Sequence, residues 1–207
     1  MEGTIVGLQR TTLGVSDGDI PLTIDSAQYI MPAHLRNVEA VRAARIFSAC
    51  TGAAGVAPGT ALGTAPPLTL YNPQGSSVGL AIHSIRMGYL SGTLAAGLVA
   101  LVANPSLTQA APSGGTALTA RCAFVGYSAG QGQAYQGSTL DATSVIVLPL
   151  FSFGPVDGSD KTFVKLEAEL EGAYMIAPGC SMSLQGIAGS GTSPLVLFGM
   201  TWEEVRL

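Results

Sequence analysis

Charged side chains are scarce in this sequence. Only 11% of its 207 residues are Asp, Glu, Lys or Arg, whereas about a quarter of the residues in an ordinary soluble domain are charged. The hydrophobic share is 47% and the mean hydropathy is +0.42, so an isolated monomer has few charges with which to cover its surface. Because large exposed apolar patches are normally interaction sites, we expect a membrane or a protein partner to cover part of this chain.

Long hydrophobic runs are also missing. The most apolar stretch, residues 94–107, is shorter than the roughly 20 apolar residues that a membrane-spanning helix needs, and Asn104-Pro105 interrupts it. The N-terminus lacks the basic and then apolar layout of a signal peptide. We therefore expect no membrane partner and predict a homo-oligomer.

Clusters of basic residues are absent as well. The net charge is −4, and the lysines and arginines are scattered along the chain, whereas a nucleic-acid groove needs clustered cations that face phosphates. We expect no nucleic-acid partner.

Metal-binding and redox patterns are equally poor. Cys50, Cys122 and Cys180 are far apart, odd in number and without C-x-x-C spacing, so they predict buried free thiols and neither a zinc cluster nor a disulfide framework. The two histidines have no acidic residue close by in the sequence, and His83 is interpreted as a strand residue that is hydrogen-bonded locally. No metal site is expected.

One motif does suggest catalysis. Residues 126–130, Gly-Tyr-Ser-Ala-Gly, match the G-x-S-x-G pattern of hydrolases, in which an acid and a histidine follow the nucleophilic serine in the chain. Both His34 and His83 precede Ser128, and no helical periodicity follows it. The pattern therefore predicts a glycine turn at the end of a strand. Because no P-loop, dinucleotide or H-E-x-x-H pattern occurs either, we expect no enzyme activity and no cofactor.

From residue 45 onward, short β-rich runs alternate with Gly, Pro, Ser and Asn clusters, which is typical of an all-β sandwich. A short helix, with Asn37 as a possible cap and Glu39 and Arg42 paired at i,i+3, is predicted before them over residues 37–47. The predicted strands cover residues 45–50, 68–71, 78–89, 97–103, 118–126, 144–153, 162–170, 180–187 and 195–205.

Two kinds of strand pattern are present. In residues 162–170, Lys165, Glu167 and Glu169 alternate with apolar residues, which indicates one solvent-exposed face. Glu167 and Glu169 could be interpreted as a glycosidase pair, but charges that alternate on a solvated face are the ordinary outcome. Residues 144–153 and 194–202 are apolar on both faces, as in central strands or strands covered by a neighbouring subunit. Pro149 indicates an edge or a bulge in the first of these.

Residues 1–44 are predicted to form an N-terminal arm that is mostly extended, since residues 2–32 lack the periodicity that would bury a face within the domain. Such a segment becomes ordered by placing its apolar side chains on other surfaces, and neighbouring subunits are the expected hosts. The arm residues expected to bind these other surfaces are Ile5, Val6, Leu8, Ile20, Leu22 and Ile30.

Two turns carry a resemblance to a known class of proteins. Residues 72–76, Asn-Pro-Gln-Gly-Ser, lie between apolar strands in the stretch 68–97, and Pro178-Gly179 leads into the last strands in the stretch 170–205. From about residue 45 to the end, the chain resembles the small jelly-roll proteins that decorate or cement the heads of tailed bacteriophages.

This resemblance implies an all-β, jelly-roll-like β-sandwich over residues 45–207 with an extended N-terminal arm. It also implies a trimeric, non-enzymatic virion protein on the capsid surface, made in the host cytoplasm, with the major capsid protein as its partner. The alternative is a receptor- or glycan-binding jelly roll of a fibre or tail. Glycan sites usually expose aromatic residues, and Trp202 lies in an apolar strand that favours the core.

Overall fold

The protein is described by a computed structural model for residues 37–106, 110–127, 130–141, 145–155 and 165–207. Its elements are α1 (Val38–Arg42), β1 (Ile46–Cys50), β2 (Leu68–Tyr71), β3 (Val78–Ser91), β4 (Gly97–Asn104), β5 (Thr116–Leu118), β6 (Arg121–Cys122), β7 (Gln133–Gln136), β8 (Val145–Phe153), β9 (Lys165–Glu169), β10 (Met175–Ile176), β11 (Ser181–Ile187) and β12 (Leu195–Arg206).

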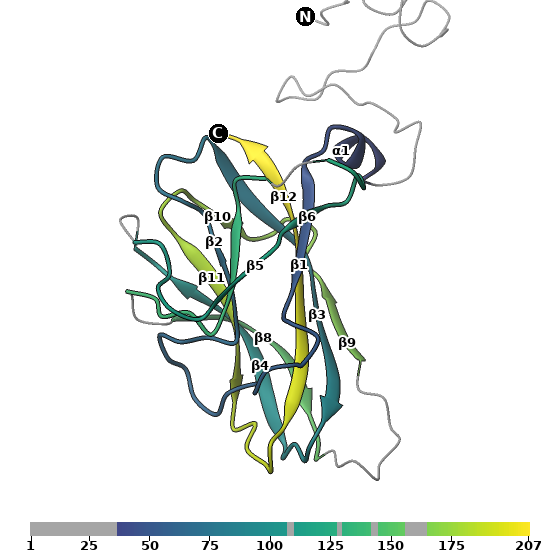
Figure 1. Ribbon diagram of the computed structural model, residues 1–207, viewed down its shortest axis with the longest axis vertical. Coiled ribbons are helices and arrows are strands. Elements are labelled where there is room, and N and C mark those ends of the chain that lie inside the picture. The colour runs from purple at the N-terminus through teal and green to yellow at the C-terminus, as the bar shows by residue number, and fades with distance from the viewer. Residues whose placement is uncertain (1–36, 107–109, 128–129, 142–144, 156–164) are drawn as a thin grey trace, which may run out of the picture. The chain divides into compact units, whose positions relative to one another are not determined.

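The strands form two six-stranded antiparallel sheets that pack face to face (Figure 1). The first sheet has the order β10-β3-β12-β1-β6, with β9 also paired to β3, and the second has the order β5-β7-β2-β11-β4-β8. The chain passes from one sheet to the other along β1, β2, β3 and β4, and again along β8, β9, β11 and β12, whereas β4 and β8 pair within the second sheet. Strand β1 lies beside β12, the last strand. This connectivity is that of a jelly roll, so the predicted all-β, jelly-roll-like sandwich is confirmed.

The helix predicted over residues 37–47 is shorter than expected. It ends at Arg42, and β1 begins at Ile46. The predicted i,i+3 pair is present, with Arg42 Nη1 3.2 Å from Glu39 Oε1. Asn37 has a φ of 72°, which differs from the extended backbone of an ordinary N-cap residue.

The strand predicted over residues 118–126 is wrong. β5 ends at Leu118, β6 contains only Arg121 and Cys122, and a turn follows in which the Tyr127 N–H donates to the Phe124 carbonyl. The strands β7 and β10 were not predicted, because β10 has only two residues and the four residues of β7 are mostly polar, unlike the apolar run of β2. They exist because longer neighbours, β2 and β3, offer them backbone partners.

The core lies between the two sheets. Trp202 is fully buried and its ring stacks on that of Phe47 with centroids 6.2 Å apart, so the prediction that Trp202 is a core residue is confirmed. The other large, fully buried side chains come from both sheets and from the loop after β3: Leu68, Leu70, Leu80, Ile82, Ile85, Met87, Leu94, Leu101, Ile176, Leu184 and Phe198.

A β-bulge at His83 keeps the long strand β3 in register with the core. Ile82 pairs with Trp202 and Ser84 pairs with Thr201, so His83 is the extra residue. Apolar residues face the core at even positions before the bulge and at odd positions, such as Ile85, after it. A regular strand would have turned its second half to the other face. The bulge therefore matches the shift in the sequence pattern.

Strand β8 lies at the edge of the second sheet and is irregular. Its register with β4 shifts between Val99 and Ala100 and again between Leu101 and Val102. The first shift falls beside Pro149, so the prediction of an edge or a bulge there is confirmed in both respects. Proline and bulges both weaken the pairing capacity of an exposed edge.

The two turns that carry the sequence resemblance meet in space. The Gly179 N–H donates to the Asn72 carbonyl at 2.8 Å, and the Asn72 N–H donates to the Cys180 carbonyl at 3.0 Å. The buried Asn72 amide donates to the carbonyls of Val78 and Ile176 at 2.7 and 2.9 Å. Gly75 and Gly179 have φ values of 75° and 79°, which favour glycine. The motifs thus hold β2, β3, β10 and β11 together at one end of the sandwich.

Candidate interaction surface

The two sheets differ in where they carry charge. The strands of the second sheet contain no Asp, Glu, Lys or Arg, whereas all charged residues that lie in strands belong to the first sheet. The scarcity of charge in the sequence is therefore concentrated in one half of the sandwich.

The outer face of the second sheet is covered by the protein's own loops. Gln185 on β11 is buried, and its amide accepts from the Gly63 N–H at 2.9 Å and donates to the Gly63 carbonyl at 3.2 Å. The same amide group donates to Ser183 Oγ at 3.0 Å. The loop is also held by a bond from the Gly186 N–H to the Pro58 carbonyl at 2.7 Å. Around β2 and β11 this face needs no charges, because Thr69, Ser183 and Gln185 are buried there, whereas the edge strand β8 stays exposed.

The outer face of the first sheet is exposed and charged. Arg86 Nε on β3 donates to Glu167 Oε1 on β9 at 2.5 Å, and Arg86 Nη2 lies 3.9 Å from Glu169 Oε1. Glu167 and Glu169 are exposed, and Leu166 and Ala168 between them are half-buried, so the predicted alternation is confirmed. The two carboxylates share a guanidinium on an open strand face, which is the ordinary solvated arrangement and no glycosidase pocket.

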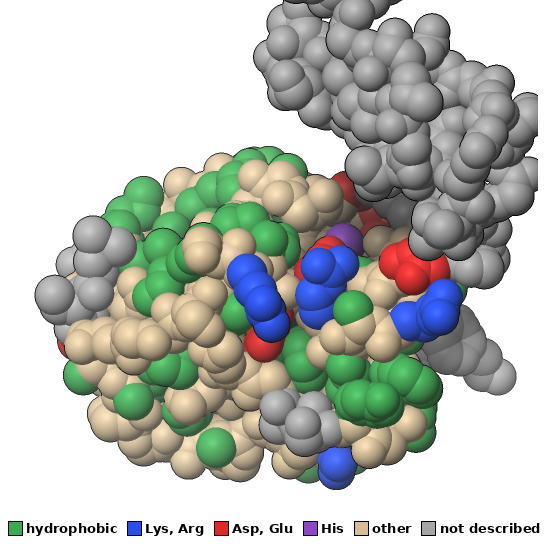
Figure 2. Space-filling view, turned by 90° about the horizontal axis from the view of Figure 1, so that it is seen from above, with side chains coloured by type: hydrophobic (Ala, Val, Ile, Leu, Met, Phe, Trp, Pro, Cys, Tyr) green, Lys and Arg blue, Asp and Glu red, His purple; other side chains and the backbone are tan. Residues whose placement is uncertain are grey.

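A second charged group lies around the bulge. His83 Nε2 is 3.2 Å from Glu203 Oε2, and Arg45 Nη2 is 3.2 Å from Glu203 Oε1. His83 is thus hydrogen-bonded within the sheet as predicted, although to a partner 120 residues away that local sequence could not indicate. Figure 2 shows basic and acidic side chains close together in one band, with hydrophobic and uncharged side chains around it.

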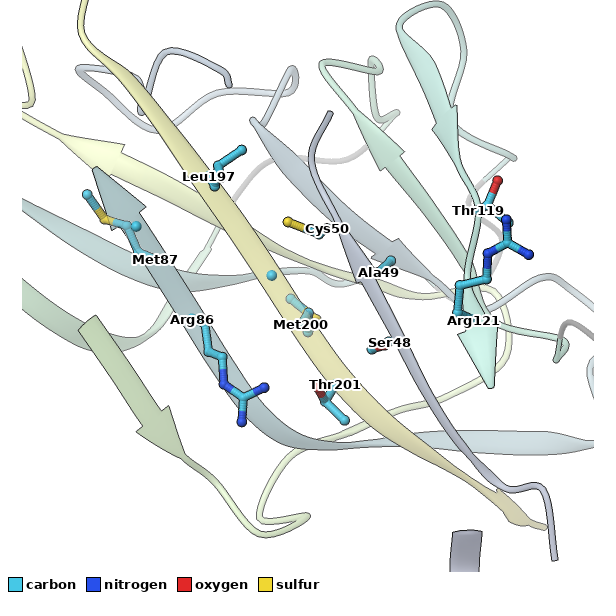
Figure 3. Close-up of a pocket in the computed structure, with 12 residues that line it drawn as sticks. Ser48, Ala49, Cys50, Arg86, Met87, Thr119, Arg121, Leu197, Met200 and Thr201 are labelled. Atoms are coloured by element: carbon cyan, nitrogen blue, oxygen red, sulfur yellow. The ribbon is translucent and has the colours of Figure 1, made fainter. Parts of the chain in front are cut away.

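A groove of about 560 Å³ crosses this face. Its floor is made by β1 and β12, which contribute small residues such as Ser48, Cys50 and Gly199. Arg86 and Arg121 stand on opposite sides, with β12 and β1 between them (Figure 3). The lining contains two arginines and no acidic residue. We call it the arginine groove.

The arginine groove was not predicted from the sequence. Arg86 and Arg121 are 35 positions apart, on strands that do not pair with each other, and only the sheet order places them on one face. Arg121 is exposed and makes no ion pair or side-chain hydrogen bond within the described part of the chain. Two guanidinium groups beside small polar residues can bind carboxylates.

The hydrolase-like motif has a structural explanation at its glycines. Ser128 lies outside the described residues, but Gly126 has a φ of 101° within the turn after β6. A Cβ on Gly130 would lie 2.2 Å from Glu204 Oε1 and 2.8 Å from Phe47 Cζ, so a larger residue there would force these side chains to move. The Gly132 N–H then donates to Glu204 Oε1 at 2.8 Å. The glycines of the motif let the chain approach the inner side of the first sheet.

The turn after β6 also exposes aromatic rings. Phe124 and Tyr127 stack with centroids 4.6 Å apart and are 40% and 58% exposed. Between them Val125 is 91% exposed. The sequence predicts a strand over residues 118–126, and a strand pattern gives no signal for an exposed aromatic pair.

The cysteines are free, as predicted, but only one is buried. Cys122 is buried, Cys180 is intermediate and Cys50 is exposed on the floor of the arginine groove. The prediction of three buried thiols is wrong for Cys50, because the outer position on β1 faces solvent. Burial raises the pKa of the Cys180 thiol, and a backbone hydrogen bond at Ser106 opposes this effect in part.

Other predicted features fall partly beyond the structure. The arm residues Ile5, Val6, Leu8, Ile20, Leu22 and Ile30 lie outside the described residues. In the described ranges, no three His, Cys, Asp or Glu side chains are grouped so that they could hold a metal ion. Among those same residues, no helix has the length and apolar character needed to cross a membrane.

Comparison of the chain with protein-family models, curated proteins and solved structures returned no match.

Proposed function

We propose that this chain is a non-enzymatic structural protein of a bacteriophage particle, which decorates or cements the capsid as a homo-oligomer. Residues 1–44 act as its arm, and the sandwich supplies the surface between copies. The oligomer is a trimer and its partner is the major capsid protein, by the resemblance of the two turns around Asn72 and Gly179. The particle surface is its place of action.

The observation that carries this proposal is the apolar surface left uncovered on the sandwich. Val145 and Ile146 at the start of the edge strand β8 are 50% and 46% exposed, and the strand has no charged residue. Exposed apolar patches of this kind mark contact sites between proteins. Pro149 and the bulges discourage backbone pairing at this edge, so side-chain packing is the expected mode of contact.

Sedimentation tests the oligomer directly. At micromolar concentration the unmodified protein is expected to sediment above the 21.0 kDa of one chain. Val145→Lys with Ile146→Lys should shift it toward the monomer, because a charge in an apolar interface is desolvated without a partner. Ser152→Lys is the matched control, since it adds a charge to an exposed position of the same strand. A monomer at every concentration would contradict the proposal.

Attachment to particles tests the arm. Deleting residues 1–35 is expected to change the melting temperature of the sandwich only slightly, since no strand or helix periodicity links this segment to the core. The same deletion should abolish binding to empty capsids in a pelleting assay. A truncated protein that fails to fold, or that binds capsids at full occupancy, would show that the arm has another role.

The absence of catalysis is tested at Ser128. A fluorophosphonate probe should leave the purified protein unlabelled, because neither histidine follows this serine in the chain. Stoichiometric labelling that Ser128→Ala removes would establish a hydrolase.

A receptor- or glycan-binding module is the second candidate, and the exposed stack of Phe124 and Tyr127 favours it. Aromatic faces at the surface can pack on apolar faces of a ligand while the Tyr hydroxyl hydrogen-bonds. Screening on a glycan array tests this function. A glycan bound by the unmodified protein, and lost in Tyr127→Ala but not in Tyr89→Phe, would favour receptor binding over decoration.

A further inference from the structure

The arginine groove has a chemistry that the proposed function does not yet use. Arg121 makes one side of its lining positive, Arg86 on the other side is neutralised by Glu167 and Glu169, and the residues of the floor are small and uncharged. Arg86 already holds Glu167, whereas the described part of the chain provides Arg121 with no acidic partner. A ligand that supplies carboxylates would complete the groove, because guanidinium groups form strong, charge-assisted hydrogen bonds with them.

The sequence contains a segment with the complementary charge. Residues 11–35 include Asp17, Asp19 and Asp25 and no Lys or Arg, so their side chains sum to a charge of −3. Apolar side chains, among them Ile20 and Leu22, lie between Asp19 and Asp25 in the sequence. The groove offers an apolar partner as well, the half-buried side chain of Leu197.

The distance across the groove also agrees with the length of residues 11–35. Arg86 on β3 and Arg121 on β6 are separated by three inter-strand spacings, or about 14 Å between backbones. Asp19 and Asp25 are up to about 20 Å apart in an extended chain, and arginine side chains extend beyond their backbone positions. From residue 36 back to residue 19, an extended chain reaches about 56 Å, which is enough to meet a second copy.

We propose that the arginine groove binds residues 11–35 of a second copy of this chain, with the aspartates of that segment beside Arg121. This inference rests on the proposed function, since it names the surface on which the assembly arm of one subunit is held by the next. The positive charge of the groove and the negative charge of the arm are then complementary.

Cys50 on the groove floor supplies a native probe for this contact. A full-length donor chain with Asp19→Cys and Cys50→Ser is mixed with the unmodified protein, in the absence of capsids, and treated with a short bismaleimide. The expected product is a covalent dimer in which position 19 is linked to Cys50. Cys180 serves as an internal control because burial raises the pKa of its thiol and it does not line the groove.

Charge reversal makes the test specific. Arg121→Glu in the acceptor chain should lower the dimer yield about tenfold, which corresponds to about 1.4 kcal/mol, because an attraction becomes a repulsion. Adding Asp17→Arg to the donor should restore part of that yield. Arg121 is exposed, so its replacement is not expected to unfold the protein, and thermal melting of the variant checks this.

Several outcomes would overturn the groove assignment. These are no link to Cys50, equal linking to Cys180, a yield that Arg121→Glu leaves unchanged, or a chain with Asp19→Cys alone that links only to its own Cys50. If linking fails while deletion of residues 1–35 still abolishes capsid attachment, the groove assignment is wrong and the proposed function stands.

Discussion

The polar side chains on the outer faces of the two sheets find their hydrogen-bond partners in different ways. On the second sheet, Thr69, Ser183 and Gln185 are buried, and a loop satisfies Gln185 through backbone hydrogen bonds. On the first sheet, Arg86, Glu167 and Glu203 form ion pairs at the surface. The comparison shows that low charge in a sequence does not by itself mean exposed apolar surface. In this protein, loops cover an uncharged but polar face, so that face does not need charged side chains.

A lysine placed on each outer face in turn should give the largest difference in the free energy of unfolding. Ser183→Lys puts a charge on a fully buried position of β11 and is expected to cost more than about 4 kcal/mol of unfolding free energy, since the ammonium is buried without a partner. Ser48→Lys on the exposed floor of β1 should change it by less than about 0.5 kcal/mol. Urea denaturation measures both, and equal losses would remove the distinction between the faces.

Removing one side chain from the covered face should have a smaller effect. Gln185→Ala removes the two hydrogen bonds that the Gln185 amide makes with the Gly63 N–H and carbonyl in a part-buried site, which costs about 1–3 kcal/mol. Thr201→Ala on the first sheet is the control, with an expected change within about 0.5 kcal/mol. A loss in the control as large as that in Gln185→Ala would show that the loop contributes little.

The first sheet has one close backbone approach of its own, at Gly130. Gly130→Ala places a Cβ within contact of Glu204 and Phe47 and is expected to destabilise the protein by about 1–3 kcal/mol through overpacking. Gly154→Ala is matched to it, because nothing lies within 4 Å of a Cβ there. Thermal melting of the pair decides, and an unchanged melting temperature for Gly130→Ala would contradict the structural interpretation of the motif.

Removing an ion pair from the first sheet should have the smallest effect on the free energy of unfolding. Glu167→Gln removes an exposed charge from Arg86 and is expected to cost about 0.2–1 kcal/mol at low salt, with a smaller effect at high salt because of screening. Glu169→Gln, which removes the more distant partner of Arg86, should cost less. Denaturation at two salt concentrations measures both variants, and a salt-independent loss would point to packing and not to charge.

Much of the fold could be predicted because its strands are long and patterned. The alternation around Glu167 and the apolar run that contains Trp202 predicted β9 and β12, and Pro149 predicted the irregular edge at β8. Short strands such as β7 escaped prediction, since their pairing partners and not their own residues create them. The low charge of the sequence predicted that a partner covers part of the surface, but it did not predict where. The groove between Arg86 and Arg121 could not be predicted at all.

The amino-acid sequence alone determined that this chain forms a β-sandwich, because apolar residues at every second position must share one face of a sheet. It also determined where glycine turns end the strands, as at Gly75 and Gly179. Only the tertiary structure decided which charges meet, because His83 and Glu203, or Arg86 and Glu167, become neighbours through the order of strands in a sheet. That order depends on pairing between strands that are far apart in the chain, and local sequence patterns do not predict it.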